Sequence, residues 1–276
     1  MFLKVGDEMA TGEAKMMTAE EKFVFDLQGY IVIKNVLATE EVAEINEISD
    51  RIFPRDYGDE DNVKKTGGLR RTGNISKWDP ACQRLIDHPN VTSYLNELLG
   101  PTFRLDHDYC IFMCRSGEQK GVLHGGLETT SRCQFYKYYD GIIRNGLSAL
   151  TFFFADVGPG DGGFVCIPGS HKSNFLSGLP TDVRELKRLE SYVVQPVAEA
   201  GDVLLFTEAL VHGTRSWQAE HERRTFLYKY CPGHISYSQN YYSVNDYFNP
   251  TDQQRRILSP PSADGRLVSF DYPKGV

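Results

Sequence analysis

Two histidines and one arginine have the residue types and surroundings needed for metal and carboxylate chemistry. His124 and His212 each follow a short apolar run and precede a glycine, and Arg223 lies shortly after the second histidine. A neutral imidazole is a common metal ligand, and a guanidinium can grip a carboxylate through two parallel hydrogen bonds. Thr214 follows His212 closely and could add a hydroxyl donor to the same carboxylate. The pattern predicts a two-histidine metal site beside a carboxylate-binding site.

The acidic ligand that usually completes such a metal site is missing from this sequence. Fe(II) sites of this kind combine two imidazoles with one carboxylate, which together cover one face of the ion. The carboxylate is expected two positions after the first histidine, where this chain has Gly126. None of the seven histidines is followed two positions later by Asp or Glu, so no alternative histidine restores the pattern.

Three other histidines have simpler structural explanations. His88 precedes a proline, which is typical of a helix end, and we interpret it as a cap. His171 follows Pro-Gly-Ser and is expected to anchor a turn. His107 lies between two aspartates on an expected strand, where it is either a supporting group behind a site or an ordinary surface residue.

Other catalytic motifs are absent or stand in the wrong context. Residues 158–163 match G-x-G-x-x-G, but the apolar run 164–167 that follows indicates a strand. A dinucleotide site needs that motif at the start of a helix, so we interpret residues 158–163 as a hairpin turn. The chain contains neither G-x-S-x-G nor H-E-x-x-H, which disfavours the corresponding hydrolases.

Composition favours a single globular domain that binds a small molecule. The 276 residues are 41% hydrophobic and 12% aromatic, which is enough for a packed core. The formal charge is −7 and the basic residues form no long block, so a nucleic-acid polymer is not an expected partner. A small anionic substrate needs only a local cationic patch.

The cysteines and the apolar runs indicate a reducing compartment. Six cysteines are present without a C-x-x-C pair, which fits neither a zinc ribbon nor a small disulfide scaffold. We find no signal peptide and no apolar run long enough to span a membrane. We therefore expect a cytoplasmic protein that does not bind a membrane.

The first hundred residues are expected to be mainly helical. Thr18 and Glu21 form a capping-box pattern that begins a helix, and residues 30–36 read as a strand. Thr39 is expected to cap a second helix with a regular apolar face, and residues 79–99 form helix interrupted near Pro89.

Residues 54–77 are polar and glycine-bearing, and two interpretations remain open. The first is a solvated loop. The second is a lid that carries cations to an anionic substrate, with Lys65, Arg70 and Arg71 as the candidate substrate-binding residues.

From residue 103 onward, short β-rich runs alternate with turns, which is typical of an antiparallel sandwich or barrel. The expected strands are residues 103–114, 133–139, 149–156, 163–167, 192–197, 203–206 and 225–230. The domain therefore comprises a helical N-terminal cover (1–100), a β core (101–233) and a C-terminal segment (234–276). That last segment either wraps the surface or folds over the mouth of the site.

Residues 103–233 resemble the phytanoyl-CoA dioxygenase-like family of Fe(II)/2-oxoglutarate enzymes. The similar segments are 123–126, 156–171, 201–206, 212–214 and 223–224. The resemblance implies a mainly β fold with flanking helices, namely a double-stranded β-helix (jelly roll, cupin-like) with N-terminal helices. It implies that His124 and His212 bind iron, and that Arg223 holds the distal carboxylate of 2-oxoglutarate with the help of Thr214.

Gly126 departs from the family pattern in the way that a halogenase subset does. In that subset, a small residue replaces the iron-binding aspartate and chloride occupies the open position. The resemblance implies that O2 and 2-oxoglutarate give succinate, CO2 and an Fe(IV)-oxo group that abstracts a substrate hydrogen. Chloride, rather than hydroxide, is then transferred to the substrate radical. The closest resemblance within the subset is to halogenases that act on a deoxyadenosine nucleotide such as 2′-deoxyadenosine monophosphate.

Two other functions stay open at this point. One is a hydroxylase with a two-histidine site, in which water or an outside carboxylate such as Glu128 fills the third position. The other is a non-catalytic jelly-roll binding protein that has lost its metal.

Overall fold

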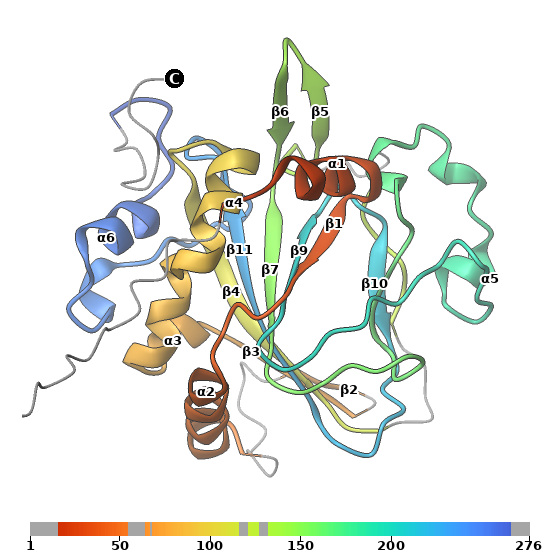
Figure 1. Cartoon of the computed structure of the whole chain (residues 1–276), viewed down its shortest axis with the longest axis horizontal. Coiled ribbons are helices and arrows are strands. Elements are labelled where there is room, and N and C mark those ends of the chain that lie inside the picture. The colour runs from red at the N-terminus through yellow and green to blue at the C-terminus, as the bar shows by residue number, and fades with distance from the viewer. Residues whose placement is uncertain (1–15, 55–63, 67, 116–120, 127–131, 266–276) are drawn as a thin grey trace, which may run out of the picture.

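The computed structural model describes residues 16–54, 64–66, 68–115, 121–126 and 132–265. Its main feature is a seven-stranded antiparallel sheet (Figure 1). In spatial order the strands are β1 (Tyr30–Ile33), β9 (Val203–Thr207), β7 (Ser148–Phe153), β11 (Arg223–Cys231), β4 (Arg104–Met113), β3 (Leu69–Gly73) and β2 (Lys64–Thr66).

A second, smaller sheet faces the main one. It contains β8 (Gly163–Cys166) and β10 (His212–Arg215), and isolated bridges from Val194 and His124 extend its two edges. A hairpin of β5 (Tyr136–Tyr139) and β6 (Ile142–Asn145) projects beyond the sheets (Figure 1). Two facing antiparallel sheets with flanking helices form the expected jelly roll.

Helices cover the outer face of the main sheet, whereas the smaller sheet covers its inner face (Figure 1). The helices on the outer side are α2 (Thr39–Ile52), α3 (Pro80–Arg84), α4 (Pro89–Leu99) and α6 (Asp252–Leu258). Helix α1 (Ala19–Gln28) precedes β1, and the short α5 (Thr181–Arg184) lies beside β10.

Alternation along the strands divides the apolar residues into two cores. On β7, Leu150 and Phe152 pack in the outer core with the helices, whereas Ala149 and Phe153 pack in the inner core. The inner core lies between the two sheets, and Phe164 of β8 contributes to it. Residues that face this inner core are the ones placed to form a site.

Several expectations for the N-terminal part need correction. Ala38, not Thr39, is the N-cap of α2, because the Glu41 carboxylate accepts a hydrogen bond from the Ala38 backbone N–H. The expected loop at 54–77 contains β2 and β3, which extend the main sheet beyond β4. The expected helical cover therefore also supplies three strands, including β1.

The C-terminal part also differs in detail from the sequence interpretation. Residues 192–197 contain an isolated bridge at Val194 rather than a strand, and β6, β10 and α6 were not predicted. Tyr247 and Ile257 pack in the outer core, so this part of the C-terminal segment wraps the helical side of the main sheet, whereas Tyr237 stacks on His107 of β4.

Candidate active site

The two histidines of the predicted metal site are neighbours across a β-bridge. The backbone N–H groups of His124 and His212 each donate to the carbonyl oxygen of the other, at 2.8 Å. The centres of the two imidazole rings lie 4.4 Å apart. His212 is buried in a cluster with the rings of Phe164 and Phe206, whereas His124 is exposed. The pair therefore lies where the inner core opens to solvent.

Hydrogen bonds orient both imidazoles in the same manner. Nδ1 of His212 lies 2.8 Å from the Leu210 carbonyl oxygen, and Nδ1 of His124 lies 3.2 Å from that of Val122. A carbonyl can only accept, so each Nδ1 carries the proton and each Nε2 keeps a lone pair for a metal. Burial lowers the pKa of His212 to about 4, which keeps this ligand neutral at physiological pH.

Gly126 has a backbone conformation that points any side chain away from the histidine pair. Its φ is +88°, and a Cβ there would lie 2.2 Å from Cδ1 of Leu176 and 3.0 Å from Cγ2 of Val211. Leu176 and Val211 belong to an apolar cluster with Leu123, on the face of the small sheet opposite to the histidine side chains. Position 126 therefore places no side-chain ligand beside the histidine pair.

Arg223 is a buried cation inside the fold. Arg223 is 3% exposed, and its Nη1 lies 3.7 Å from the sulfur of Met113. Among the described residues, its Nε has no hydrogen-bond partner. Burial lowers its pKa to about 10, so it stays charged at neutral pH. A buried, unpaired guanidinium is costly, and a bound carboxylate would satisfy it.

Thr214 and Phe164 are paired across β10 and β8, and alternation places Thr214 on the same face as His212. The residues expected to hold the metal and 2-oxoglutarate thus lie on β10 of the smaller sheet (His212 and Thr214), on β11 of the main sheet (Arg223) and on the bridge at His124. These residues fit both groups: two oriented imidazoles suit Fe(II), and an unsatisfied guanidinium suits the distal carboxylate of the keto acid.

The three candidate substrate-binding residues on β2 and β3 do not form one cluster. Nη1 of Arg70 donates to the Phe53 and Pro54 carbonyls, and its Nη2 pairs with Glu222 at 2.7 Å, so both terminal nitrogens of the guanidinium have partners in the outer layer. Arg71 points to the other face, where its guanidinium carbon lies 3.6 Å from the ring centre of Tyr109. Lys65 pairs with Arg70 in the backbone register, and its side chain lies outside the described residues.

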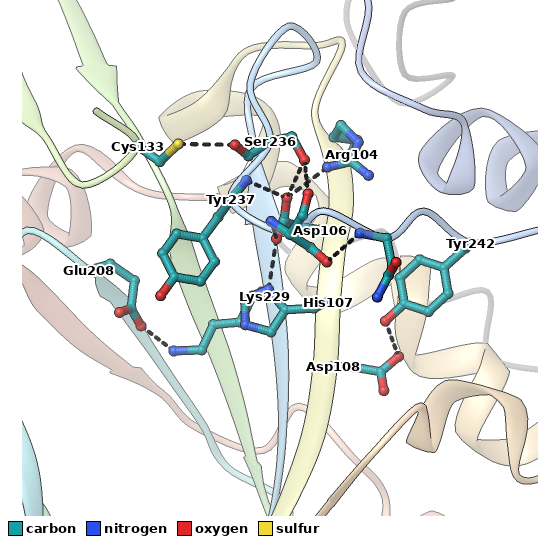
Figure 2. Close-up of polar contacts among 12 residues, drawn as sticks. Arg104, Asp106, His107, Asp108, Cys133, Glu208, Lys229, Ser236, Tyr237 and Tyr242 are labelled. Atoms are coloured by element: carbon teal, nitrogen blue, oxygen red, sulfur yellow. Dashed lines mark hydrogen bonds and ion pairs between the residues drawn. The ribbon is translucent and has the colours of Figure 1, made fainter. Parts of the chain in front are cut away.

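Aromatic side chains continue from Arg71 along the inner face of β4. His107 stacks on Tyr109 with 5.9 Å between ring centres and on Tyr237 with 5.7 Å. Asp106 holds Nδ1 of His107 at 2.7 Å, so His107 supports this aromatic row (Figure 2). The cation and the rings together form a surface suited to a planar anionic molecule.

Sequence reasoning missed two charged residues beside the histidine pair. Glu208 follows β9, and one of its oxygens lies 3.8 Å from Nε2 of His212. Lys229, on β11, forms an ion pair with Glu208 (Figure 2). Each is an isolated charge in an otherwise apolar or aromatic run, and such residues are seldom buried unless paired. An isolated charge within an apolar run was therefore the sequence feature that could have identified Glu208 and Lys229.

Three other residues were considered from the sequence, namely His171, His88 and Glu128. His171 is buried and anchors a turn through Asp26, as expected. His88 ends the 3-10 helix at Leu85–Asp87, as expected, and its side chain also caps the start of α4. Glu128, the outside carboxylate considered for a hydroxylase, lies outside the described residues.

The fold is a jelly roll in which two histidines are neighbours across a β-bridge and one arginine is buried. The profile of phytanoyl-CoA dioxygenase (PhyH) matches residues 25–225. The ectoine dioxygenase of Sphingopyxis alaskensis is 22% identical over 221 residues, which are 72% of this chain and 70% of that protein.

Solved structures share the fold. HygX from Streptomyces hygroscopicus, with nickel and 2-oxoglutarate bound, has a TM-score of 0.68 at 24% identity, over 79% of this chain and 89% of HygX. EctD from S. alaskensis, with 2-oxoglutarate and 5-hydroxyectoine, has a TM-score of 0.60 at 20% identity, over 78% and 76% of the two chains. The protein belongs to the phytanoyl-CoA dioxygenase family of Fe(II)/2-oxoglutarate-dependent oxygenases.

No helix in the described ranges has the length and apolarity required to cross a bilayer.

Proposed function

We propose that the protein is an Fe(II)/2-oxoglutarate-dependent halogenase that chlorinates an unactivated C–H bond of a small molecule. One observation carries this proposal: Gly126 places no carboxylate at the third protein position of the metal site. A site with only two neutral imidazoles lacks a negative ligand, and chloride can restore both the charge and the coordination. The net reaction converts substrate, chloride, 2-oxoglutarate, O2 and one proton to chlorinated substrate, succinate, CO2 and water.

The chain's own residues have separate tasks in this proposal. His124 and His212 hold the iron through Nε2, and Arg223 with Thr214 orients 2-oxoglutarate by its distal carboxylate. Bound iron and 2-oxoglutarate supply the oxidising power that removes a hydrogen atom from the substrate. Phe164 and Phe206 enclose His212 and exclude water from the inner side. The substrate must lie closer to the halide than to a hydroxyl ligand for chlorination to prevail.

A deoxyadenosine nucleotide, such as 2′-deoxyadenosine monophosphate, is our proposed substrate. Arg71 is the candidate cation for its phosphate, and the aromatic row of His107, Tyr109 and Tyr237 is the candidate surface for the purine. Arg70 is set aside as a phosphate ligand because Glu222 and two carbonyls already occupy its guanidinium. Lys65 stays a candidate on its sequence position.

The test is product analysis with and without chloride. The anaerobically iron-loaded protein is mixed with 2-oxoglutarate, a panel of nucleoside monophosphates and air, and the products are resolved by mass spectrometry. A halogenase gives a chlorinated nucleotide with the chlorine isotope pattern, and bromide shifts the product mass. A hydroxylated product that forms equally well without chloride would overturn the proposal.

Hydroxylation is the second candidate function, and one observation favours it. The carboxylate of Glu208 lies 3.8 Å from Nε2 of His212, so this chain contains a buried negative group near the metal position. If Glu208 bound the iron, the site would again have two imidazoles and one carboxylate. Turnover would then be independent of chloride.

A further inference from the structure

Glu208 and Lys229 form a buried ion pair next to the histidine pair. Lys229 lies opposite Ala149 in the register of β11 and β7, and Ala149 lies opposite Phe206 of β9. The small Ala149 leaves room for the lysine to cross β7, where its Nζ lies 4.8 Å from the ring centre of Phe206 and contacts Oε1 of Glu208. The two side chains are only 4% and 7% exposed, so the pair is shielded from solvent.

The other carboxylate oxygen faces the metal position. Oε2 of Glu208 lies 3.8 Å from Nε2 of His212, and the Gln134 side chain donates to the same oxygen at 3.5 Å. Two ligand atoms that each bind one ion at about 2.1 Å can be up to about 4.2 Å apart. The carboxylate therefore lies within one small movement of a cation held by His212.

We propose that Lys229 is a latch that holds the Glu208 carboxylate off the metal, and so keeps the third position open to an external halide. This inference rests on the proposed halogenase site. The lysine cancels the charge of Glu208 within the inner core, so the pair contributes no net negative charge to the ion. Movement of Glu208 onto the metal would break a buried ion pair and leave the ammonium of Lys229 unpaired in a dry environment.

Removal of the latch should change the metal site in a defined way. In Lys229→Met, Glu208 loses its cation and becomes a buried, uncompensated carboxylate, for which the metal is the nearest available positive charge. The variant should gain a third protein ligand and lose its response to chloride. Glu208→Gln should weaken metal binding, because it leaves the ammonium of Lys229 uncompensated near the ion. The double variant Lys229→Met/Glu208→Gln removes both charges and should keep the wild-type affinity, because the proposal excludes Glu208 from coordination in the wild-type protein.

The experiment measures metal and anion binding without turnover. Co(II) replaces Fe(II), and its visible absorption is followed in the presence of 2-oxoglutarate, with and without chloride. The set comprises wild type, Lys229→Met, Glu208→Gln and the double variant Lys229→Met/Glu208→Gln, which removes both charges and guards against misfolding from an unpaired group. Thermal unfolding of each metal-free variant checks the fold.

We expect wild type and the double variant to bind Co(II) with affinities within about threefold of each other, and Lys229→Met to bind about tenfold more tightly, or better. Chloride should not change the spectrum of Lys229→Met, and the double variant should recover the wild-type response to chloride. A tenfold loss of affinity in the double variant, about 1.4 kcal/mol, would show that Glu208 is already a ligand in the wild-type protein and overturn the latch. An unchanged affinity in Lys229→Met would also overturn it.

Failure of the halogenase proposal gives a different pattern. If wild type ignores chloride while Lys229→Met still gains affinity through Glu208, the latch stands and the open position serves another ligand. The double variant then identifies Glu208 as the source of the gain, because it should return to the wild-type affinity.

Discussion

Gly163 makes room for the guanidinium of Arg223: a Cβ at position 163 would lie 2.6 Å from Nε of the arginine. The φ of Gly163 is +78°, so both its conformation and its missing side chain suit this contact. The glycine-rich turn at 158–163, which precedes β8, thus helps to place the cation that we assign to 2-oxoglutarate.

Arg223 and its neighbour Arg224 provide a matched test of that assignment. Arg223→Gln should weaken 2-oxoglutarate binding about 100-fold, because charge-assisted hydrogen bonds to a buried carboxylate contribute about 3 kcal/mol. Arg224 points to the outer face and pairs with Asp50 and Glu222, so Arg224→Gln should change this affinity by less than about threefold. Calorimetric titration of the metal-loaded proteins measures both. Equal effects of the two substitutions would contradict the assignment.

Substitutions of Gly126 test whether this position can rebuild a carboxylate site. Gly126→Ala should cost about 1–2 kcal/mol of folding free energy, from its positive φ and its contact with Leu176. Gly126→Asp should cost more, because it directs a carboxylate into an apolar cluster, and it should not tighten metal binding. Urea unfolding and Co(II) titration give the two quantities. A gain in metal affinity with loss of the chloride response in Gly126→Asp would show that the turn rotates toward the ion.

Arg71 and Arg70 are adjacent but should behave differently. Arg71→Ala should raise the apparent KM for a nucleoside monophosphate by about tenfold or more, with little change in melting temperature, because it faces the inner side beside Tyr109. Arg70→Ala should instead lower the melting temperature, because it removes the buried ion pair between Arg70 and Glu222. Steady-state kinetics and calorimetry distinguish the two. Unchanged KM values for Arg71→Ala would remove it from the substrate site.

The arrangement of the catalytic groups was accessible from sequence for residues that share a local pattern. His124 and His212 each follow a short apolar run and Arg223 precedes another, which indicates positions at the ends of buried strands, and the family resemblance supplied their expected roles. The contact between Glu208 and Lys229 could not be predicted from the sequence, because it crosses β7 and depends on the small side chain of Ala149. Such a contact is set by strand order, which periodicity does not encode.

The strands β2 and β3 within residues 54–77 were not predicted for a similar reason. Polar residues and glycines favour a loop when the segment is considered alone. In the structure, the free edge of β4 offers hydrogen-bonding groups that recruit Leu69–Gly73 as a strand. The direction in which Gly126 would point a side chain likewise depends on its φ, which the residue type permits but does not fix.

The folding stability of the metal-free protein should fall below neutral pH through His171. Burial lowers the pKa of His171 to about 4, whereas an exposed histidine titrates near 6.5. Between these values the unfolded chain binds more protons, so this contribution is complete above about pH 6.5 and is lost as the pH falls toward about 4. The difference corresponds to at most about 3 kcal/mol.

His171→Gln is the variant that isolates this contribution. It should lower stability at pH 7 but flatten the dependence between about pH 6.5 and pH 4, as measured by urea unfolding at a series of pH values. Parallel curves for wild type and variant across this range would contradict a neutral, buried His171.

The most direct test of the central claim is the visible spectrum of the anaerobic protein with Fe(II) and 2-oxoglutarate, recorded with and without chloride. We predict a metal-to-ligand charge-transfer band that shifts or strengthens when chloride is added, because the halide enters the position left uncovered by Gly126. A band that forms but is indifferent to chloride would contradict the halogenase and favour the hydroxylase. The absence of any band would contradict the iron and 2-oxoglutarate site itself.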